Sequence, residues 1–313
     1  MSPATPRLVN IRIHPIKSLD PVYLNECRIG PAGGLALDRA WALHSVDGKW
    51  VTATRAPILH RVRASYSPDL RSVTLSIPGD SRQIPTRTFA FPDAHEDAAE
   101  WFSVLFDQQI IIRYSPDGFP DDPIANGPTL VSSASLRAVC EWFPQITLEE
   151  ARQRFRTNLE IDFVDDDASA KSRAVSQSPA ASLGAATVLR TPTSSAAAPL
   201  DEAATREPST MPAFWEDRLF GENERSVVRF KIGEVNIEGS NPCLRCPVPP
   251  RNPLTGEDLI GFQKRFHQLR EATLPAWSPR ARFDDFYRFA INTRVAHTEA
   301  NKLLRLSDPL TLS

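Results

Sequence analysis

The sequence is poor in the residues that mark several classes of protein. Four cysteines among 313 residues are too few for a disulfide framework in a chain of this length, which favours a reducing compartment. The formal charge of −2 argues against nucleic-acid binding, because such proteins carry a basic domain or stripe. No apolar run approaches the roughly 18 residues of a membrane span. We therefore expect a cytoplasmic protein with no nucleic-acid partner and no transmembrane segment.

Glycine is also scarce. Thirteen glycines against 28 prolines indicate many short elements joined by turns, because proline interrupts regular helices. Residues 1–19 hold three basic residues and no acid, as a transit peptide would. Their apolar residues fit a short folded strand better than a cleavable amphipathic helix, and we favour the strand. These apolar residues are Leu8, Ile11, Ile13 and Ile16.

The patterning predicts short strands and a few helices. Residues 41–54 read as two strands joined at Asp47-Gly48, a dipeptide that favours the positive φ of a tight hairpin turn. Ser132 or Ser133 is a suitable N-cap for the second of three expected helices. The helices are expected over 95–106, 133–142 and 258–272. Strands are expected over 61–77, 157–163 and 227–237, with a closing strand after Phe286.

The composition changes sharply over residues 165–211. Three aspartates open this stretch, and Ala, Ser, Thr and Pro dominate it without a single aromatic residue. Such a segment cannot bury enough apolar surface to offset the entropy of ordering it. We predict a disordered insertion that interrupts one domain.

The most informative motif is Asn-Pro-Cys-Leu-Arg-Cys-Pro at 241–247. A zinc ribbon would need a second pair of ligands nearby, and the other cysteines are single and distant. A thioredoxin-type pair would open a helix, but the prolines that follow Cys246 prevent one. They predict a stiff loop instead, which would hold a cysteine at a strand end as a metal ligand. Arg245 beside the thiols suits an anionic, metal-bearing ligand.

A second motif is the run from Arg154 to Ile161. If the run is a strand, alternate side chains share a face, and Arg154, Arg156 and Asn158 would project together. Two planar cations and an amide could then bind a phosphate or the edge of a heterocycle. A charged but inert strand edge is the alternative.

Taken together, these elements resemble the MOSC-domain proteins that have an N-terminal β-barrel extension. The branch they resemble most is that of the amidoxime-reducing components and their bacterial relatives, which bind the molybdenum cofactor. The resemblance covers nearly the whole chain except 165–211. It rests on an ordered set of motifs: Ile13-x-Pro15-Ile16-Lys17-Ser18, Gly34-Leu35-x-x-Asp38-Arg39-x-Trp41, Thr54-Arg55-x-Pro57-x-Leu59, Phe155-Arg156-x-Asn158, Phe214-Trp215-Glu216-Asp217, and Cys243-x-Arg245-Cys246 with Thr255-Gly256 downstream.

The resemblance implies a mainly β fold of the α+β type. An N-terminal MOSC β-barrel-like domain would occupy 6–115, with its first strand shared with the second barrel. A MOSC β-barrel domain with a few short helices would occupy 120–310 and carry the insertion.

The same resemblance implies the site residues. Cys246 would be the catalytic residue and the protein ligand of molybdenum, and Cys243 a neighbour without direct ligation. Thr129 would lie near the cofactor, and Tyr287 is the candidate for a tyrosine that contacts it. The residues that would hold the pterin and its phosphate are Lys17, Ser18, Arg39, Arg156, Asn158 and Arg245.

The activity implied is reduction of small N-hydroxylated compounds (amidoximes, hydroxylamines, and also nitrite or N-oxides). Electrons would come from a cytochrome b5 and an NADH-cytochrome b5 reductase, and family analogy also allows mitochondrial association. The alternative is a non-catalytic cofactor carrier or sulfur-handling protein. Cofactor sulfurases join a MOSC domain to a pyridoxal-phosphate domain, for which this chain has no room. The loop after Cys246 departs from the family pattern, with prolines where relatives have threonines and an Asp-Pro pair.

Overall fold

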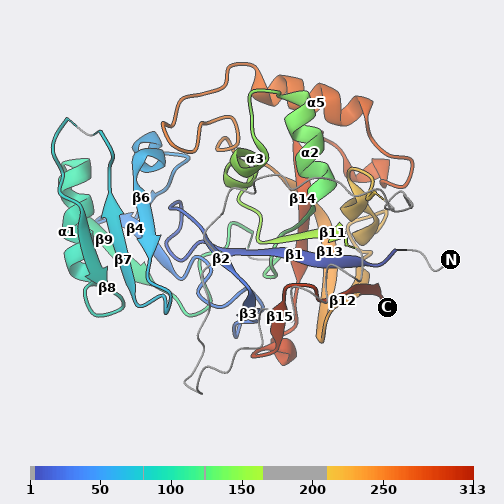
Figure 1. Cartoon of the computed structure of the whole chain (residues 1–313), viewed down its shortest axis with the longest axis horizontal. Coiled ribbons are helices and arrows are strands. Elements are labelled where there is room, and N and C mark those ends of the chain that lie inside the picture. The colour runs from blue at the N-terminus through green and yellow to red at the C-terminus, as the bar shows by residue number, and fades with distance from the viewer. Residues whose placement is uncertain (1–3, 80, 123–124, 165–209) are drawn as a thin grey trace, which may run out of the picture.

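The computed structural model describes residues 4–79, 81–122, 125–164 and 210–313 (Figure 1). Residues 165–209 of the predicted insertion lie outside the described residues. Met211, which we placed at the end of that insertion, is buried in the main hydrophobic core. The predicted insertion therefore does not extend to Met211.

The fold is mainly β and is organised around one sheet of eight strands. Its order is β16-β12-β13-β14-β10-β11-β1-β2. The buried faces of these strands form the main core, which is rich in Ile, Leu and Val. The strands are β1 (Pro6–Ile13), β2 (Val22–Leu24), β10 (Leu130–Ser132), β11 (Leu159–Phe163), β12 (Val228–Ile232), β13 (Val235–Leu244), β14 (Arg288–Arg294) and β16 (Leu310–Leu312).

The large sheet curls until its two sides approach each other. The amide of Leu8 in β1 donates to the carbonyl of Asp308 at 2.9 Å, and Ser307 donates back to Leu8 at 2.7 Å. An isolated bridge joins Arg7 to Pro309, just before β16. In the part of the chain that the structure describes, these contacts do not complete a closed barrel.

A second unit is formed by residues of the N-terminal third, on the left of Figure 1. The expected hairpin at Asp47-Gly48 is confirmed, with Gly48 at φ +81°. Helix α1 (His95–Phe106) has the predicted bounds and buries Trp101 and Phe102. The unit contains two three-stranded sheets: β4 (Trp41–Ser45), β5 (Trp50–Val51) and β9 (Ile110–Tyr114), then β6 (Arg63–Tyr66), β7 (Ser72–Ser76) and β8 (Arg87–Ala90).

Three helices lie together at the top of Figure 1, around an aromatic cluster. They are α2 (Ser133–Trp142), α3 (Leu148–Phe155) and α5 (Phe262–Ala272). Ser132 caps α2 by accepting from the amide of Ser135, as predicted. Phe155 packs on Phe289 with ring centroids 4.1 Å apart, so α3 is held against strand β14.

The remaining elements are short. Strand β3 (Glu26–Arg28) pairs with β15 (Leu303–Arg305) and so joins the two ends of the sequence. Four 3-10 turns complete the described elements: η1 (Pro57–Arg61), η2 (Trp215–Leu219), η3 (Arg280–Arg282) and η4 (His297–Glu299). No helix among the described residues has the length and apolar character needed to cross a bilayer.

Three expected elements have different bounds. The strand predicted for 157–163 begins only at Leu159. The single strand expected over 227–237 is a hairpin of β12 and β13 that turns at Gly233, where φ is +57°. The helix predicted from 258 begins at Phe262, after Gly261 in the left-handed conformation. Alternation and helical spacing locate an element. In the last two cases a glycine with positive φ decides where the element turns or begins.

Candidate functional site

A cavity of about 250 Å³ lies at one end of the large sheet. Strands β13 and β14 contribute Asn241, Cys243 and Asn292 to its wall. The other walls come from loops that precede β4 and β10 and from the connection between α3 and β11. The cavity therefore joins segments that are far apart in the sequence.

Arg156 reaches this cavity by a route that the sequence analysis did not predict. Helix α3 runs to Phe155, and Arg156 is its C-cap in the left-handed conformation, at φ 52° and ψ 38°. The expected strand alternation of Arg154, Arg156 and Asn158 is therefore wrong. Arg154 lies in the last helical turn and donates to the carbonyls of Pro249 and Pro250 at 2.8 Å each. Arg156 and Asn158 line the cavity, and Arg154 does not.

Asn158 and Thr129 form one hydrogen-bonded unit in the cavity wall. The Oδ1 atom of Asn158 accepts from the Thr129 amide at 3.2 Å and from its hydroxyl at 3.1 Å. The Asn158 amide nitrogen Nδ2 donates to the carbonyl of Arg12 at 3.1 Å. These bonds hold β10, β11 and β1 in place next to the cavity. Thr129 and Asn158 are thus adjacent, as a shared site requires.

Arg39 is held by an acid that is itself partly buried. Its guanidinium pairs with Asp38 and also approaches the carbonyl of Arg156 at 3.4 Å. Asp38 Oδ1 accepts from the backbone amide of His14 at 2.7 Å. Burial raises the pKa of Asp38, but Arg39 and the contacts with His14 together outweigh it, and the pKa is lowered. Asp38 is therefore an anion that orients Arg39 towards the cavity.

His14 lies behind this pair and is fully buried. Burial, reinforced by Arg156, lowers the pKa of His14 to about 3. Its Nδ1 atom is 3.7 Å from Asp38, beyond hydrogen-bond distance. His14 is therefore a neutral, packed side chain behind the Asp38–Arg39 pair.

Arg245 lies over the inner wall of the cavity. Its backbone amide donates to the carbonyl of Tyr287 at 3.0 Å. Its guanidinium contacts the sulfur of Cys243 at 3.1 Å and bonds the carbonyl of Phe155. The Nε atom is buried and has no partner among the described residues. An unsatisfied buried donor beside a cavity is typical of a site that binds an acceptor group.

The sequence neighbours of Cys246 line two different hollows. Cys246 itself is exposed and lies two residues beyond the end of β13. Arg245 on one side lines the cavity, and Pro247 on the other lines an open groove of about 630 Å³. Tyr287 also lines this groove, and its hydroxyl is buried without a partner among the described residues. Burial raises the pKa of Tyr287, so the hydroxyl is a protonated donor at neutral pH.

Lys17 and Ser18 lie outside the lining of the cavity. Lys17 Nζ pairs with Asp121 at 2.7 Å and lies 5.1 Å from the ring centroid of Trp50. Asp121 in turn is part of the cavity wall. Ser18 has φ 76° and accepts from the amide of Ala53 at 3.0 Å. Of the predicted site residues, the cavity brings together Arg39, Thr129, Arg156, Asn158 and Arg245.

Several residues of the cavity were missed by sequence reasoning. Asn126, Asn241 and Asn292 line it, and an isolated asparagine carries no pattern that reveals its role. Asn241 has the clearest signal, because it opens the Asn-Pro-Cys motif. Among the described residues, no group of three or more His, Cys, Asp or Glu side chains could hold a metal ion.

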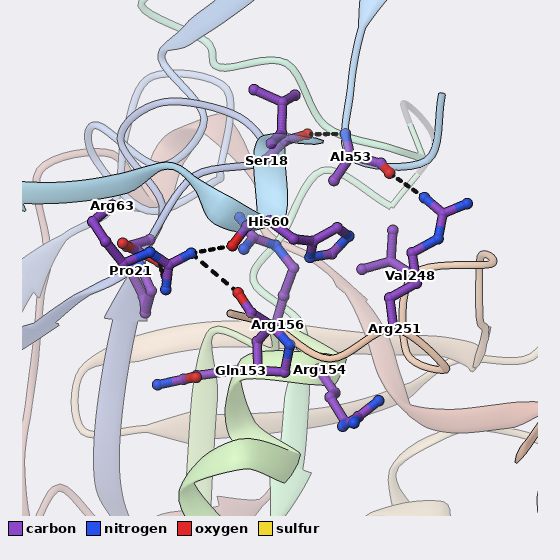
Figure 2. Close-up of a pocket in the computed structure, with 13 residues that line it drawn as sticks. Ser18, Pro21, Ala53, His60, Arg63, Gln153, Arg154, Arg156, Val248 and Arg251 are labelled. Atoms are coloured by element: carbon purple, nitrogen blue, oxygen red, sulfur yellow. Dashed lines mark hydrogen bonds and ion pairs between the residues drawn. The ribbon is translucent and has the colours of Figure 1, made fainter. Parts of the chain in front are cut away.

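A second and much smaller cavity, of about 20 Å³, lies beyond Arg156 (Figure 2). It is lined by Ser18 and by residues of η1, α3 and the proline loop, which we define as residues 247–253. Arg156 lines both cavities. Figure 2 shows His60 close to Arg156 and Arg251, with Arg63 on another side.

The fold is mainly β, and an exposed cysteine lies next in sequence to an arginine of a cation-rich cavity. Residues 5–109 match the family model of the MOSC N-terminal beta barrel domain. This match spans about a third of the chain and supports a MOSC-domain protein, and MOSC-domain proteins are associated with the molybdenum cofactor. No curated protein matches the chain.

Proposed function

We propose that the protein is a molybdenum-cofactor-dependent reductase of small N-hydroxylated compounds such as amidoximes and hydroxylamines. The observation that carries this proposal is the convergence of Arg39, Arg156 and Arg245 on one cavity, with the exposed Cys246 directly following Arg245. Guanidinium groups match phosphate and heterocycle edges. Nitrite and N-oxides are further candidate substrates.

The residues present fit this cofactor. Arg245 Nε and the Tyr287 hydroxyl are buried donors without partners, on the two sides of Cys246. Thiolate sulfur is a soft donor suited to such a metal. Arg39 and Arg156 would bind the phosphate, Asn158 and Thr129 would form the wall beside the pterin, and Cys246 would ligate the metal. When bound, the cofactor would supply oxygen-atom transfer and two electrons.

Lys17 and Ser18 would act at the edge of this site. Lys17 is held by Asp121, which lies in the cavity wall. Burial would raise the pKa of Asp121, but Arg39 and Lys17 lower it. Asp121 would therefore stay ionised and offset part of the positive charge of the cavity. Lys17, which Asp121 holds next to the cavity wall, would lie near a bound phosphate.

The groove beside Cys246 would receive the substrate. Leu259 and Phe262 give it an apolar wall. Charges of both signs also line it, from Arg251, Lys264, Asp258 and Asp285. A small, uncharged polar compound such as an amidoxime suits this mixture. Reduction of the amidoxime consumes two electrons and two protons and releases the amidine and one water. The electrons would come from a separate protein, for which a cytochrome b5 with its NADH-dependent reductase is our candidate.

A non-catalytic cofactor carrier or sulfur-handling protein is the second candidate. The observation that favours it is the proline loop, whose Pro247, Pro249 and Pro250 offer no side-chain donor next to Cys246. A carrier would bind the cofactor and yet leave an amidoxime unchanged.

The deciding experiment combines metal analysis with turnover. Wild-type protein should contain molybdenum and reduce benzamidoxime when supplied with a reduced electron donor. Cys246→Ser should abolish turnover and keep the fold, whereas Cys243→Ser, the matched control three residues away, should retain molybdenum and activity. Molybdenum without turnover would favour the carrier. Full turnover by Cys246→Ser would overturn the ligand assignment.

A further inference from the structure

The small cavity beyond Arg156 is surrounded by cations from three separate parts of the fold. Arg63 follows η1, Arg156 caps α3, and Arg251 belongs to the proline loop. Their guanidinium groups already bond backbone carbonyls: Arg63 to His60 and Pro253, Arg156 to Leu19, and Arg251 to Ala53 and Thr54. The cavity therefore lies in a junction that these arginines hold together.

The positive charge at this junction is not fully balanced. Asp20 also lines the cavity and lies 3.3 Å from Arg63, and Arg251 lies 3.5 Å from Asp258, which is largely exposed. A fourth arginine of the lining, Arg154, pairs with Glu150. No carboxylate of the described residues is within ion-pair distance of Arg156. A charge held away from solvent is costly unless a counter-charge accompanies it.

The cavity also has polar atoms that lack partners. His60 is 8% exposed, and its Nε2 atom is buried with no hydrogen-bond partner among the described residues. Arg63 Nε is likewise buried and has no hydrogen-bond partner among the described residues. Guanidinium N–H groups can only donate, and an uncharged histidine with its proton on Nε2 also donates there. Burial, and after it Arg156, lowers the pKa of His60 to about 4, so the ring is uncharged at neutral pH.

The size of the cavity limits what can enter it. Its volume of about 20 Å³ exceeds the roughly 10–15 Å³ that one water-sized particle needs. A phosphate group or a pterin ring is too large. A water molecule could donate to the second lone pairs of the Ala53 and His60 carbonyls, which already accept from guanidinium groups, but it would leave the positive charge of the junction without a counter-charge. An acceptor-only, negatively charged particle satisfies the unpartnered donors and the unbalanced charge together.

We propose that this cavity is a binding site for a single halide-sized inorganic anion, chloride in the cell. The anion would lie between His60, Arg63, Arg156 and Arg251 and would tie the proline loop to the N-terminal unit. The tight packing of this junction supports the assignment, because a Cβ added at Gly256, just beyond the loop, would lie 2.9 Å from the carbonyl of Pro57. The proposal does not depend on the proposed reductase activity, since His60, Arg63 and Arg251 line only this cavity or the groove and take no part in the cofactor site.

The direct test uses full-length protein crystallised with bromide in place of chloride. An anomalous difference map at the bromine absorption edge should contain a peak inside the cavity, within contact distance of His60 Nε2. A cavity that holds only water would overturn the proposal. So would bromide found only at exposed arginines, or a cofactor phosphate in this cavity when the protein carries the cofactor.

A solution measurement tests the same site with a matched control. At constant ionic strength, sodium bromide should raise the melting temperature above that in sodium gluconate, because an anion bound only to the folded state stabilises it. Arg251→Gln should weaken bromide binding by about tenfold or more, since it removes one charged donor. Arg229→Gln removes the same charge from an exposed ion pair on β12 and should leave bromide binding unchanged. Equal binding by both variants would overturn the proposal; if Arg251→Gln does not fold, the wild-type anomalous map decides alone.

Discussion

Single buried polar residues determine much of what the molecule can do. Asp38 pairs with the Arg39 guanidinium and so positions it at the cavity. Arg245 Nε and the Tyr287 hydroxyl remain free to donate, because neither has a hydrogen-bond partner among the described residues. Glu216 is a buried polar residue that lies outside the candidate site. Its side chain is completely buried and accepts from the Ser135 hydroxyl at 2.9 Å, while its other oxygen has no partner among the described residues.

The charge state of Glu216 predicts a pH dependence of stability. Burial, and after it the neighbouring Asp217, raises the pKa of Glu216 from 4.5 to about 7. Between these values the folded protein keeps a proton that the unfolded chain has lost, so stability should fall as the pH rises from about 4.5 to about 7. The loss is up to about 3 kcal/mol, at 1.36 kcal/mol for each pKa unit.

Glu216→Gln checks this assignment, because glutamine cannot ionise. The free energy of unfolding of this variant, measured by urea denaturation, should vary less with pH across that window than that of the wild type. Glu222→Gln removes a carboxyl from an exposed loop position and should follow the wild-type curve. A wild-type curve that is flat or rising in this window, or one that Glu216→Gln reproduces, would show that Glu216 is ionised throughout.

At the scale of elements, the helix α3 has the largest effect on the site. The strand predicted over 157–163, if extended back to Arg154, would place Arg154, Arg156 and Asn158 on one face. The helix that precedes it has its own signals, namely Thr147 as N-cap and acids in the first turn, which are a recognised start. The cavity has its arginine because Arg156 adopts the left-handed conformation at the end of this helix.

The N-cap of α3 provides a second stability prediction. Thr147 Oγ1 accepts from the amide of Glu150 at 3.1 Å. Thr147→Ala should lower the free energy of unfolding by about 1 kcal/mol, because it leaves a helix-terminal amide without its side-chain partner. Thr147→Ser keeps the hydroxyl and should lose clearly less. Urea denaturation of the three proteins measures both values, and equal losses in the two variants would refute the cap as the cause.

At the scale of the whole molecule, β1 joins the two parts of the chain. It pairs with β11 on one side and β2 on the other, although β11 lies about 150 residues later. Leu8, Ile11 and Ile13 of this strand are at most 1% exposed. Each contributes about 1.5–3 kcal/mol by burial, and the total is comparable with the roughly 5–15 kcal/mol that a whole domain has.

A fragment of residues 115–313 should therefore not fold alone. It lacks β1 and β2 of the large sheet and also β3, the partner of β15. Residues 4–28 supply all three strands, and attaching them through a flexible linker should restore a cooperative unfolding transition. Circular dichroism during urea denaturation distinguishes the two fragments. A cooperative transition of the shorter fragment, with stability like that of the whole chain, would show that β1 is dispensable.

The sequence by itself determined the local elements and the identity of the family. Hairpin chemistry at Asp47-Gly48, apolar spacing in α1 and the Ser132 cap are local properties, so they can be seen in a few consecutive residues. The ordered motifs indicated a MOSC-domain protein, in agreement with the match over residues 5–109. The role of the cysteine motif remains a prediction, since ligation depends on a cofactor.

Only the tertiary structure decided which of the proposed residues meet. Arg39, Arg156 and Arg245 are separated by about 90 residues or more along the chain, and the curvature of one sheet brings them to one cavity. The arginine-lined cavity at His60 has no sequence signature, because each arginine comes from a different element and looks like an ordinary surface charge. Whether a charged side chain is buried, paired or left with a free donor depends on what packs against it, and those contacts are made by distant parts of the chain.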